Sequence, residues 1–165
     1  MLDMKALEFD EIAKSIIYTD KYQSLKDEPH HGLNRYIHCL NVAKMTYNLA
    51  RLFKLDYISA TRGAILHDYF NDCDYKEIRG IKKNSMHPII ALNNARCEFE
   101  LNDKEENIIA SHMFPFGDIK PNCRESWLVT IADKLVAIRE CSAYKVKEQV
   151  ALWTIFLINI INVNM

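Results

Sequence analysis

The sequence contains few of the residues that interrupt helices, with only four Gly and four Pro among 165 residues. Few hairpins or tight turns can form without such residues, and the aliphatic residues recur at helical spacing. We therefore expect an all-α fold, a compact arrangement of roughly six to eight helices.

An excess of charge, a long apolar run and paired cysteines are also missing. Lys and Arg number 21 against 22 for Asp and Glu, a formal net charge of −1, so we expect neither a nucleic acid nor a membrane surface as partner. The longest apolar run, Ala151 to Val163, is shorter than the ~20 residues of a membrane-spanning helix.

The five cysteines form no C-x-x-C pair, and the N-terminus is unlike a signal peptide. We expect a reduced, cytoplasmic protein.

The length fits a single domain over residues 1–165. Its expected motif-bearing core covers about 33–140, with a helix over 3–18 and a C-terminal helix over about 144–162 packing on it. The C-terminal helix has a wide apolar face, which favours core packing and leaves a homodimer as the alternative.

Six residues with metal-binding side chains lie inside or beside predicted helices. They are His38, His67, Asp68, His87, His112 and Asp133. His38 lies at the edge of the buried face of a helix over about 34–53, and the pair His67-Asp68 follows a helix that Asp56 caps. We expect His87 at the mouth of a helix that begins near Ser85. Pro88 then occupies its first turn.

The last two members of the series lie at a helix end and in a helix centre. Asn102 and Glu105 match the capping-box pattern for a helix that His112 closes. Asp133 lies within a nearly apolar helix from Glu125 to about Cys141, where an unpaired buried charge costs several kcal/mol. Lys134 points about 100° away on that helix, so a divalent cation is the better partner.

Each of these residues also has a structural explanation. Asp133 can face solvent, His87 can be a turn residue, and His112 can favour the negative end of a helix dipole. An adjacent His and Asp occur together by chance in many proteins. As a set, however, the explanations require several independent coincidences in one order along the chain.

That ordered set resembles the HD-domain superfamily of metal-dependent phosphohydrolases, a helical fold named for its His-Asp pair. The resemblance covers about Leu33 to Glu140. It rests on five segments: Arg35 to Ala43, Ala64 to Asp68, His87-Pro88, His112-Met113 and Ile131 to Lys134.

The resemblance implies a ligand set and an activity. Minimal members hold one ion with the first His, the pair and the last Asp, which correspond here to His38, His67, Asp68 and Asp133. The two further histidines, His87 and His112, are similar to those of the small stand-alone bacterial subgroup that binds two ions and includes diadenosine tetraphosphate hydrolases. Asp68 would then bridge the ions. Such donors suit Fe, Mn, Zn, Ni or Co, and ions ~3.5–4 Å apart can activate a water that attacks phosphorus.

Several residues are candidates for binding the phosphate or moving a proton. Arg35 lies one helical turn before His38 and is the first choice for donating hydrogen bonds to a phosphate group. Further basic candidates lie in the loops before His87 and after His112: Lys82, Lys83, Lys120 and Arg124. Each of these can equally be an ordinary solvated charge. Asp72 joins His67 and Asp68 as a catalytic candidate, because it could accept a proton.

We therefore expect a hydrolase of phosphoester or phosphoanhydride bonds in a small soluble substrate such as a nucleotide. No Gly-Tyr-Pro signature is present, which argues against the cyclic-di-GMP phosphodiesterase branch. The same ligands would also serve a diiron oxygenase resembling myo-inositol oxygenase. A regulatory domain that holds metal without turnover is the third possibility.

Overall fold

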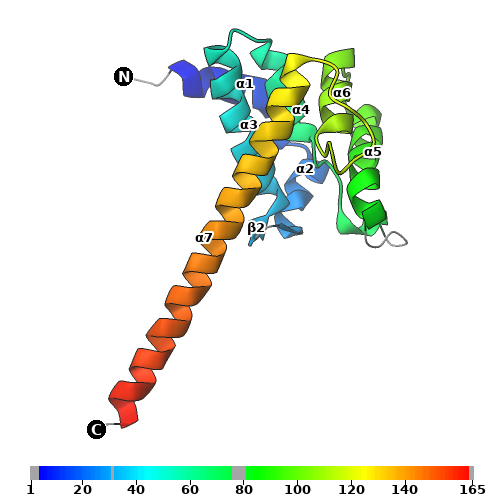
Figure 1. The fold of residues 1–165 in the computed structure, drawn as a ribbon. Helices are drawn as coiled ribbons and strands as arrows, with labels where there is room; N and C mark the ends of the chain where they lie inside the picture. Colours follow the sequence, from blue (N-terminus) through cyan, green and yellow to red (C-terminus); the bar gives the residue numbers. More distant parts are fainter. Residues whose placement is uncertain (1–3, 31, 76–80, 164–165) are drawn as a thin grey trace.

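The computed structural model describes residues 4–30, 32–75 and 81–163, and it consists almost wholly of helices (Figure 1). The α-helices are α1 (Met4–Ile17), α2 (Asp20–Ser24), α3 (Arg35–Leu52), α4 (Tyr57–Leu66), α5 (Ile81–Glu98), α6 (Asp103–Ser111) and α7 (Arg124–Val163). Two 3-10 turns, η1 (Leu25–Asp27) and η2 (Asp72–Tyr75), and two short strands, β1 (Pro29–His30) and β2 (Leu33–Asn34), complete the described elements. The strands pair antiparallel as a hairpin. The all-α prediction is confirmed.

Side-chain caps fix where the helices before the site begin. The Asn34 side chain accepts a hydrogen bond from the backbone N–H of Ile37 at the start of α3, and Asp56 caps α4 in the same way. The predicted capping box is present at α6, where Asn102 and Glu105 each accept a bond from the other's backbone. These caps set the register of the three helices that lead to His38, His67 and His112.

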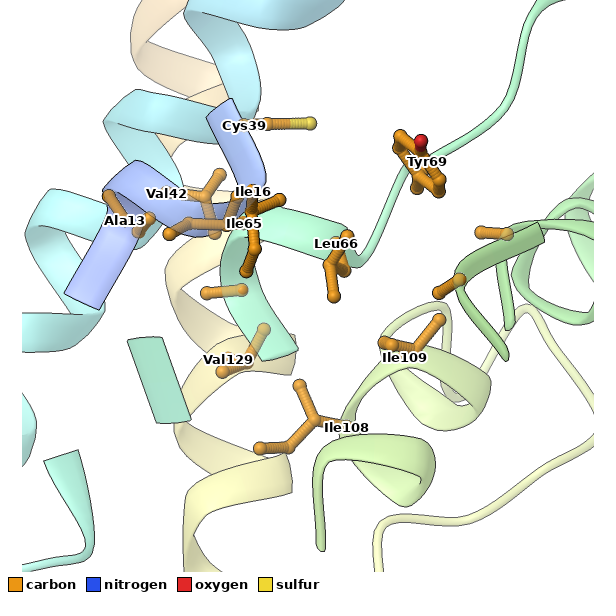
Figure 2. Packing of buried hydrophobic residues seen from close by; sticks show 14 of the residues in the cluster. Ala13, Ile16, Cys39, Val42, Ile65, Leu66, Tyr69, Ile108, Ile109 and Val129 are labelled. Carbon is orange, nitrogen blue, oxygen red and sulfur yellow. The ribbon is translucent and has the colours of Figure 1, made fainter. Parts of the chain in front are cut away.

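Helix α4 is the centre of the hydrophobic core and packs against α1, α3, α6 and α7. Ile65 and Leu66 at its C-terminal end are fully buried, and Figure 2 shows them among side chains from the surrounding helices. Burial of one such side chain contributes about 1.5–3 kcal/mol. The His-Asp pair directly follows Leu66, so the core holds the pair in place.

At Gly63, α4 lies close to the Ile108 side chain of α6. A Cβ at this position would lie 2.7 Å from Cγ2 of Ile108. Gly63→Ala should therefore destabilise the fold by about 1 kcal/mol, because overpacking costs about 1–3 kcal/mol and the gain in helix propensity is about 1 kcal/mol. Denaturant unfolding measures the change. In an Ile108→Ala background the same substitution should be neutral or stabilising; an equal loss in both backgrounds would contradict the contact.

The start of α5 differs from the prediction. The helix begins at Ile81, directly after Gly80, so Pro88 lies inside it and His87 is not at its mouth. A Pro inside a helix removes one backbone hydrogen bond at a cost of about 3 kcal/mol, but it does not prevent preceding residues from being helical. The buried positions Ala91 and Ala95 pack the following turns against the core.

The C-terminal part of the chain also differs. Separate helices were expected over 125–141 and 144–162, whereas α7 continues from Arg124 to Val163 without interruption. No Gly or Pro occurs in this range, so nothing ends the helix or lets it turn back. In Figure 1 its distal half, orange to red, runs away from the bundle instead of packing on it. The homodimer through this segment stays a prediction. No helix in the described part of the chain combines the length and apolarity needed to cross a membrane.

Candidate metal centre

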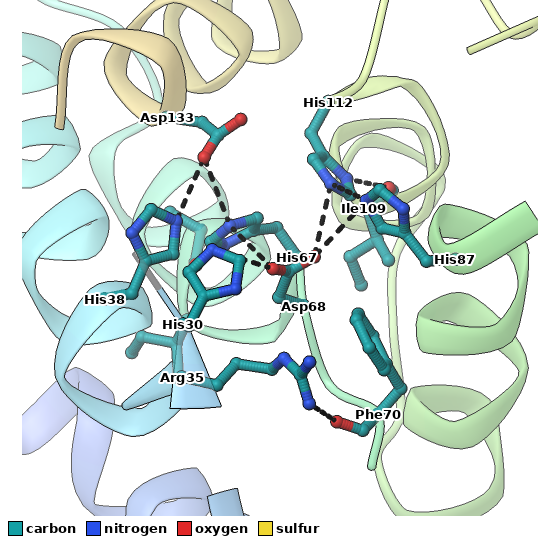
Figure 3. A network of polar contacts seen from close by, with 12 residues as sticks. His30, Arg35, His38, His67, Asp68, Phe70, His87, Ile109, His112 and Asp133 are labelled. Atoms are coloured by element: carbon teal, nitrogen blue, oxygen red, sulfur yellow. Dashed lines mark hydrogen bonds and ion pairs between the residues drawn. The ribbon is translucent and has the colours of Figure 1, made fainter. Parts of the chain in front are cut away.

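The structure brings the six predicted ligands together in one buried cluster (Figure 3). His38 comes from α3, His67 and Asp68 from the end of α4, His87 from α5, His112 from the end of α6, and Asp133 from α7. Five segments that are distant in sequence therefore meet at a single point.

The cluster divides into two groups with Asp68 between them. Asp133 Oδ1 lies 3.1 Å from His38 Nε2 and 3.6 Å from His67 Nε2. On the other side, Asp68 Oδ1 lies 3.5 Å from His87 Nε2 and 3.4 Å from His112 Nε2. Asp68 Oδ2 lies 4.0 Å from His67 Nε2. Ligands about 2.1 Å from a shared ion are at most about 4.2 Å apart, so both groups have dimensions suited to an ion.

Backbone carbonyls orient two of the imidazoles. His67 Nδ1 lies 2.8 Å from the carbonyl oxygen of Ala64, and His112 Nδ1 lies 2.8 Å from that of Ile109. A carbonyl can only accept, so in each ring Nδ1 carries the proton that is donated. Nε2 then offers a lone pair to the centre of the cluster when the ring is neutral, which is the arrangement that a metal ligand needs.

Two buried polar atoms in the cluster have no hydrogen-bond partner, namely His67 Nε2 and Asp68 Oδ1. An unsatisfied buried polar atom costs about 1–3 kcal/mol, and more when it is charged. A divalent cation would satisfy both atoms directly. Imidazole and carboxylate donors together suit Fe, Mn, Zn, Ni or Co, so the residues present fit such an ion.

The carboxylates of the cluster are held in the ionised form. Burial raises the pKa of Asp133, but the hydrogen bond with His38 and the nearby His67 ring outweigh it and lower that pKa below its usual range. Burial likewise raises the pKa of Asp68, and His67 and His112 more than reverse the change. For His38 burial lowers the pKa, whereas bonds with Asp133 and Glu140 raise it to about 10. Binding of an ion at His38 must therefore displace a proton from this ring.

Glu140 is a buried residue of the site that sequence reasoning did not identify. Its Oε2 lies 2.8 Å from His38 Nδ1, and its Oε1 accepts a hydrogen bond of 2.8 Å from Asn41 Nδ2. This contact fixes the His38 ring with Nε2 toward Asp133. The sequence held one signal, since Glu140 follows Asp133 by two helical turns and so shares its face of α7.

Glu140→Gln should weaken the ion at His38, because the neutral amide no longer stabilises an oriented and basic imidazole. We expect a loss of about 10–100-fold in the affinity for that ion, measured by metal titration. The exposed neighbour Arg139 provides the control, and Arg139→Gln should leave the affinity unchanged. Equal affinities in Glu140→Gln and the parent protein would contradict the role of the carboxylate.

Two further residues join the centre without having been predicted. His30 Nε2 in the hairpin lies 3.9 Å from Asp68 Oδ2. Lys134 donates hydrogen bonds to the carbonyl oxygens of His112 (3.0 Å) and Thr130 (3.3 Å). Burial lowers the pKa of Lys134 and the charge of Asp133 partly opposes this.

A cavity of about 280 Å³ opens onto the cluster. Besides Asp68, His87, His112 and Asp133, it is lined by His30, Arg35, Phe70, Met113, Phe116, Lys134 and Ala137. The lining thus combines cationic side chains with apolar ones. The cavity can hold a phosphate group beside the metal ligands together with a less polar part of a substrate.

The residues that were predicted to bind phosphate or move a proton lie in different surroundings. Arg35 lines the cavity but is buried, and its guanidinium donates to the carbonyl oxygen of Phe70 (2.8 Å) and to Asp72 Oδ1 (3.1 Å). Asp72 thus pairs with Arg35, and the residues described as lining the cavity do not include Asp72, Lys120 or Arg124. Arg124 is exposed at the start of α7.

Lys82 and Lys83 lie in the first turn of α5. Their side chains are outside the described residues, so their contribution to phosphate binding stays a prediction.

Comparison with known families agrees with the ligand geometry. Residues 35–138 match the HD domain family. The chain belongs to the HD-domain family. HD domains bind divalent metals, and the family suggests a metal-dependent phosphohydrolase. No solved structure matches the chain significantly.

Two curated relatives of this HD-domain protein carry the name Ribonuclease Y. The protein from Treponema pallidum (strain Nichols) is 34% identical over 109 residues, which is 66% of this chain and 20% of the relative. The protein from Pseudothermotoga lettingae is 35% identical over 115 residues, 70% of this chain and 21% of the relative. The chain therefore spans about a fifth of the length of these relatives.

Proposed function

We propose that this HD-domain protein hydrolyses a phosphoester or phosphoanhydride bond in a small phosphorylated molecule such as a nucleotide, with two divalent transition-metal ions. The observation that carries the proposal is the position of Asp68. One of its oxygens faces His87 and His112, and the other faces His67. A carboxylate so placed can bridge two ions.

The residues around the cavity have different roles in binding and orienting a substrate. Bound ions would supply an activated water and neutralise phosphate charge. The ammonium of Lys134, anchored by two carbonyls, adds a positive charge at the cavity wall for a phosphate oxygen. The apolar side chains of Met113, Phe116 and Ala137 also line the cavity and can contact a base and exclude water.

The dimensions of the site favour a small substrate over RNA. A cavity of about 280 Å³ is close to the lower end of the range for small-molecule sites. A net charge of −1 provides no general attraction for a phosphate backbone. The names of the relatives state an activity on RNA, which makes short RNA the necessary comparison substrate.

Elemental analysis of protein purified without chelator, followed by a substrate screen with the metals found, tests the proposal. We expect about two transition-metal ions per chain and release of phosphate or nucleotide from at least one nucleotide, dinucleoside polyphosphate or phosphomonoester. Cleavage of single-stranded RNA alone would contradict the small substrate. Oxygen consumption without phosphate chemistry would instead indicate an oxygenase.

A further inference from the structure

We propose that His30 is an additional protein ligand of the ion at His38, presented by the β1–β2 hairpin. This inference rests on the metal-binding part of the proposed function. It adds a residue outside the six ligands discussed above and outside residues 35–138, which match the family.

The position of His30 relative to Asp68 matches that of an expected ligand. His30 Nε2 lies 3.9 Å from Asp68 Oδ2, and His67 Nε2 lies 4.0 Å from the same oxygen. Asp68 Oδ2 therefore has two imidazole nitrogens at nearly equal distances. Both distances are within the ~4.2 Å that separates two ligands on opposite sides of one ion.

His38 places the same ion beside His30. The ring centroids of His30 and His38 are 4.4 Å apart. His30, His38 and Asp68 each offer a ligand atom, and these atoms lie within 4.8 Å of one another. Figure 3 shows the His30 ring next to His38 and Asp68. Small side-chain rotations would bring all three donors to a common ion.

The hairpin is held so that His30 stays at this place. Two strands of two residues are not stable in isolation. Gly32, in the turn, has φ +82°, and a Cβ there would lie 2.3 Å from Cδ2 of Tyr144 on α7. The backbone N–H of Arg35 donates to the carbonyl oxygen of Glu28 (2.9 Å) and closes the base of the hairpin. Glycine is needed in this turn for its positive φ and for the close contact with α7.

A fifth protein ligand changes which metals suit the first ion. With His30 added to His38, His67, Asp68 and Asp133, the donors exceed the four that a tetrahedral Zn²⁺ site uses. Fe, Mn, Co and Ni accept six-coordinate sites and would be favoured. The second ion, at His87 and His112, is unaffected by this argument.

Titration of the metal-free protein with Co²⁺, followed by calorimetry and visible absorption, tests the role of His30. In His30→Ala we expect one of the two Co²⁺ ions to bind about tenfold or more weakly, with a stronger visible absorption from the lower coordination number. His30→Gln should behave similarly. The second ion should bind as in the parent protein.

Two further variants separate loss of the ligand from damage to the hairpin. Pro29→Ala changes an exposed residue beside His30 and should leave both affinities unchanged. Gly32→Ala should weaken the same ion as His30→Ala, because the turn can no longer keep its contact with Tyr144. Unaltered Co²⁺ affinity and absorption in both His30 variants would overturn the inference and leave the proposed function standing. Failure of the parent protein to bind any ion would overturn both.

Discussion

Replacing Asp68 with alanine should remove both metal ions and abolish hydrolysis. Asp68 Oδ1 faces the second pair of histidines at 3.4 and 3.5 Å, and Oδ2 faces His67 at 4.0 Å. Each ion loses a ligand and a negative charge at the same time. No other residue named in this centre contacts both groups through separate oxygens. Elemental analysis after dialysis should find far less than one ion per chain, and phosphate release should fall to the level without enzyme.

A substitution of the same type far from the centre provides the control. Asp10 is exposed on α1, and Asp10→Ala should keep two ions and full activity. Two ions per chain in Asp68→Ala would exclude a bridging role. One ion retained would show that Asp68 serves a single site.

The same variant should lose the stabilisation that metal gives. An ion that binds only the folded chain stabilises it by about 2.7 kcal/mol at a free concentration 100 times its dissociation constant. The parent protein should therefore melt at a higher temperature with metal than with chelator. Asp68→Ala should melt at the same temperature in both, which thermal unfolding measures. A shift as large as that of the parent protein would place the bound metal elsewhere.

The sequence was sufficient to predict the fold class and which residues meet in the cluster. Helical spacing and the scarcity of Gly and Pro predicted an all-α protein, and the Asn102–Glu105 capping box is present as expected. The six residues could be identified because side-chain type and position relative to a helix end are local properties. Asp133 in an apolar helix needed a partner, and the structure provides His38 and His67.

Residues that reach the site through tertiary contacts could not be identified in this way. His30 lies in a hairpin that depends on contact with Tyr144, more than a hundred positions away. Glu140 resembles a surface residue of a helix until α3 covers it. In the sequence, Lys134 was considered only as a possible ion-pair partner for Asp133. In the structure its side chain lines the cavity instead. In each case the deciding contact joins distant segments, which local periodicity does not report.

The start of α5 and the continuity of α7 were predicted wrongly for a different reason. Pro88 predicted a helix start near Ser85, but a single Pro removes only one hydrogen bond and α5 starts earlier, at Ile81. Between residues 141 and 144 no breaker supports the division that was expected, and α7 continues. The absence of Gly and Pro was therefore the better signal at α7, whereas at α5 the presence of one Pro was a misleading one.

Replacing His112 with alanine should remove the second ion and spare the first. His112 Nε2 lies 2.9 Å from His87 Nε2 and 3.4 Å from Asp68 Oδ1, so its nearest partners belong to the second group. The first group keeps Asp133 with His38 and His67 at 3.1 and 3.6 Å. Elemental analysis should find about one ion per chain. Activity should fall by about 10²-fold or more, since one source of charge stabilisation for the phosphate is lost.

His87→Ala should reproduce this result, and the double variant with His112→Ala should lose no further metal, because both residues hold the same ion. His38→Ala should instead release the first ion. Unchanged metal content in both His87→Ala and His112→Ala would show that the centre holds a single ion, and the two histidines would then serve the substrate. Since Asp68→Ala is expected to lose both ions and His112→Ala only one, the difference between these two variants measures the bridge itself.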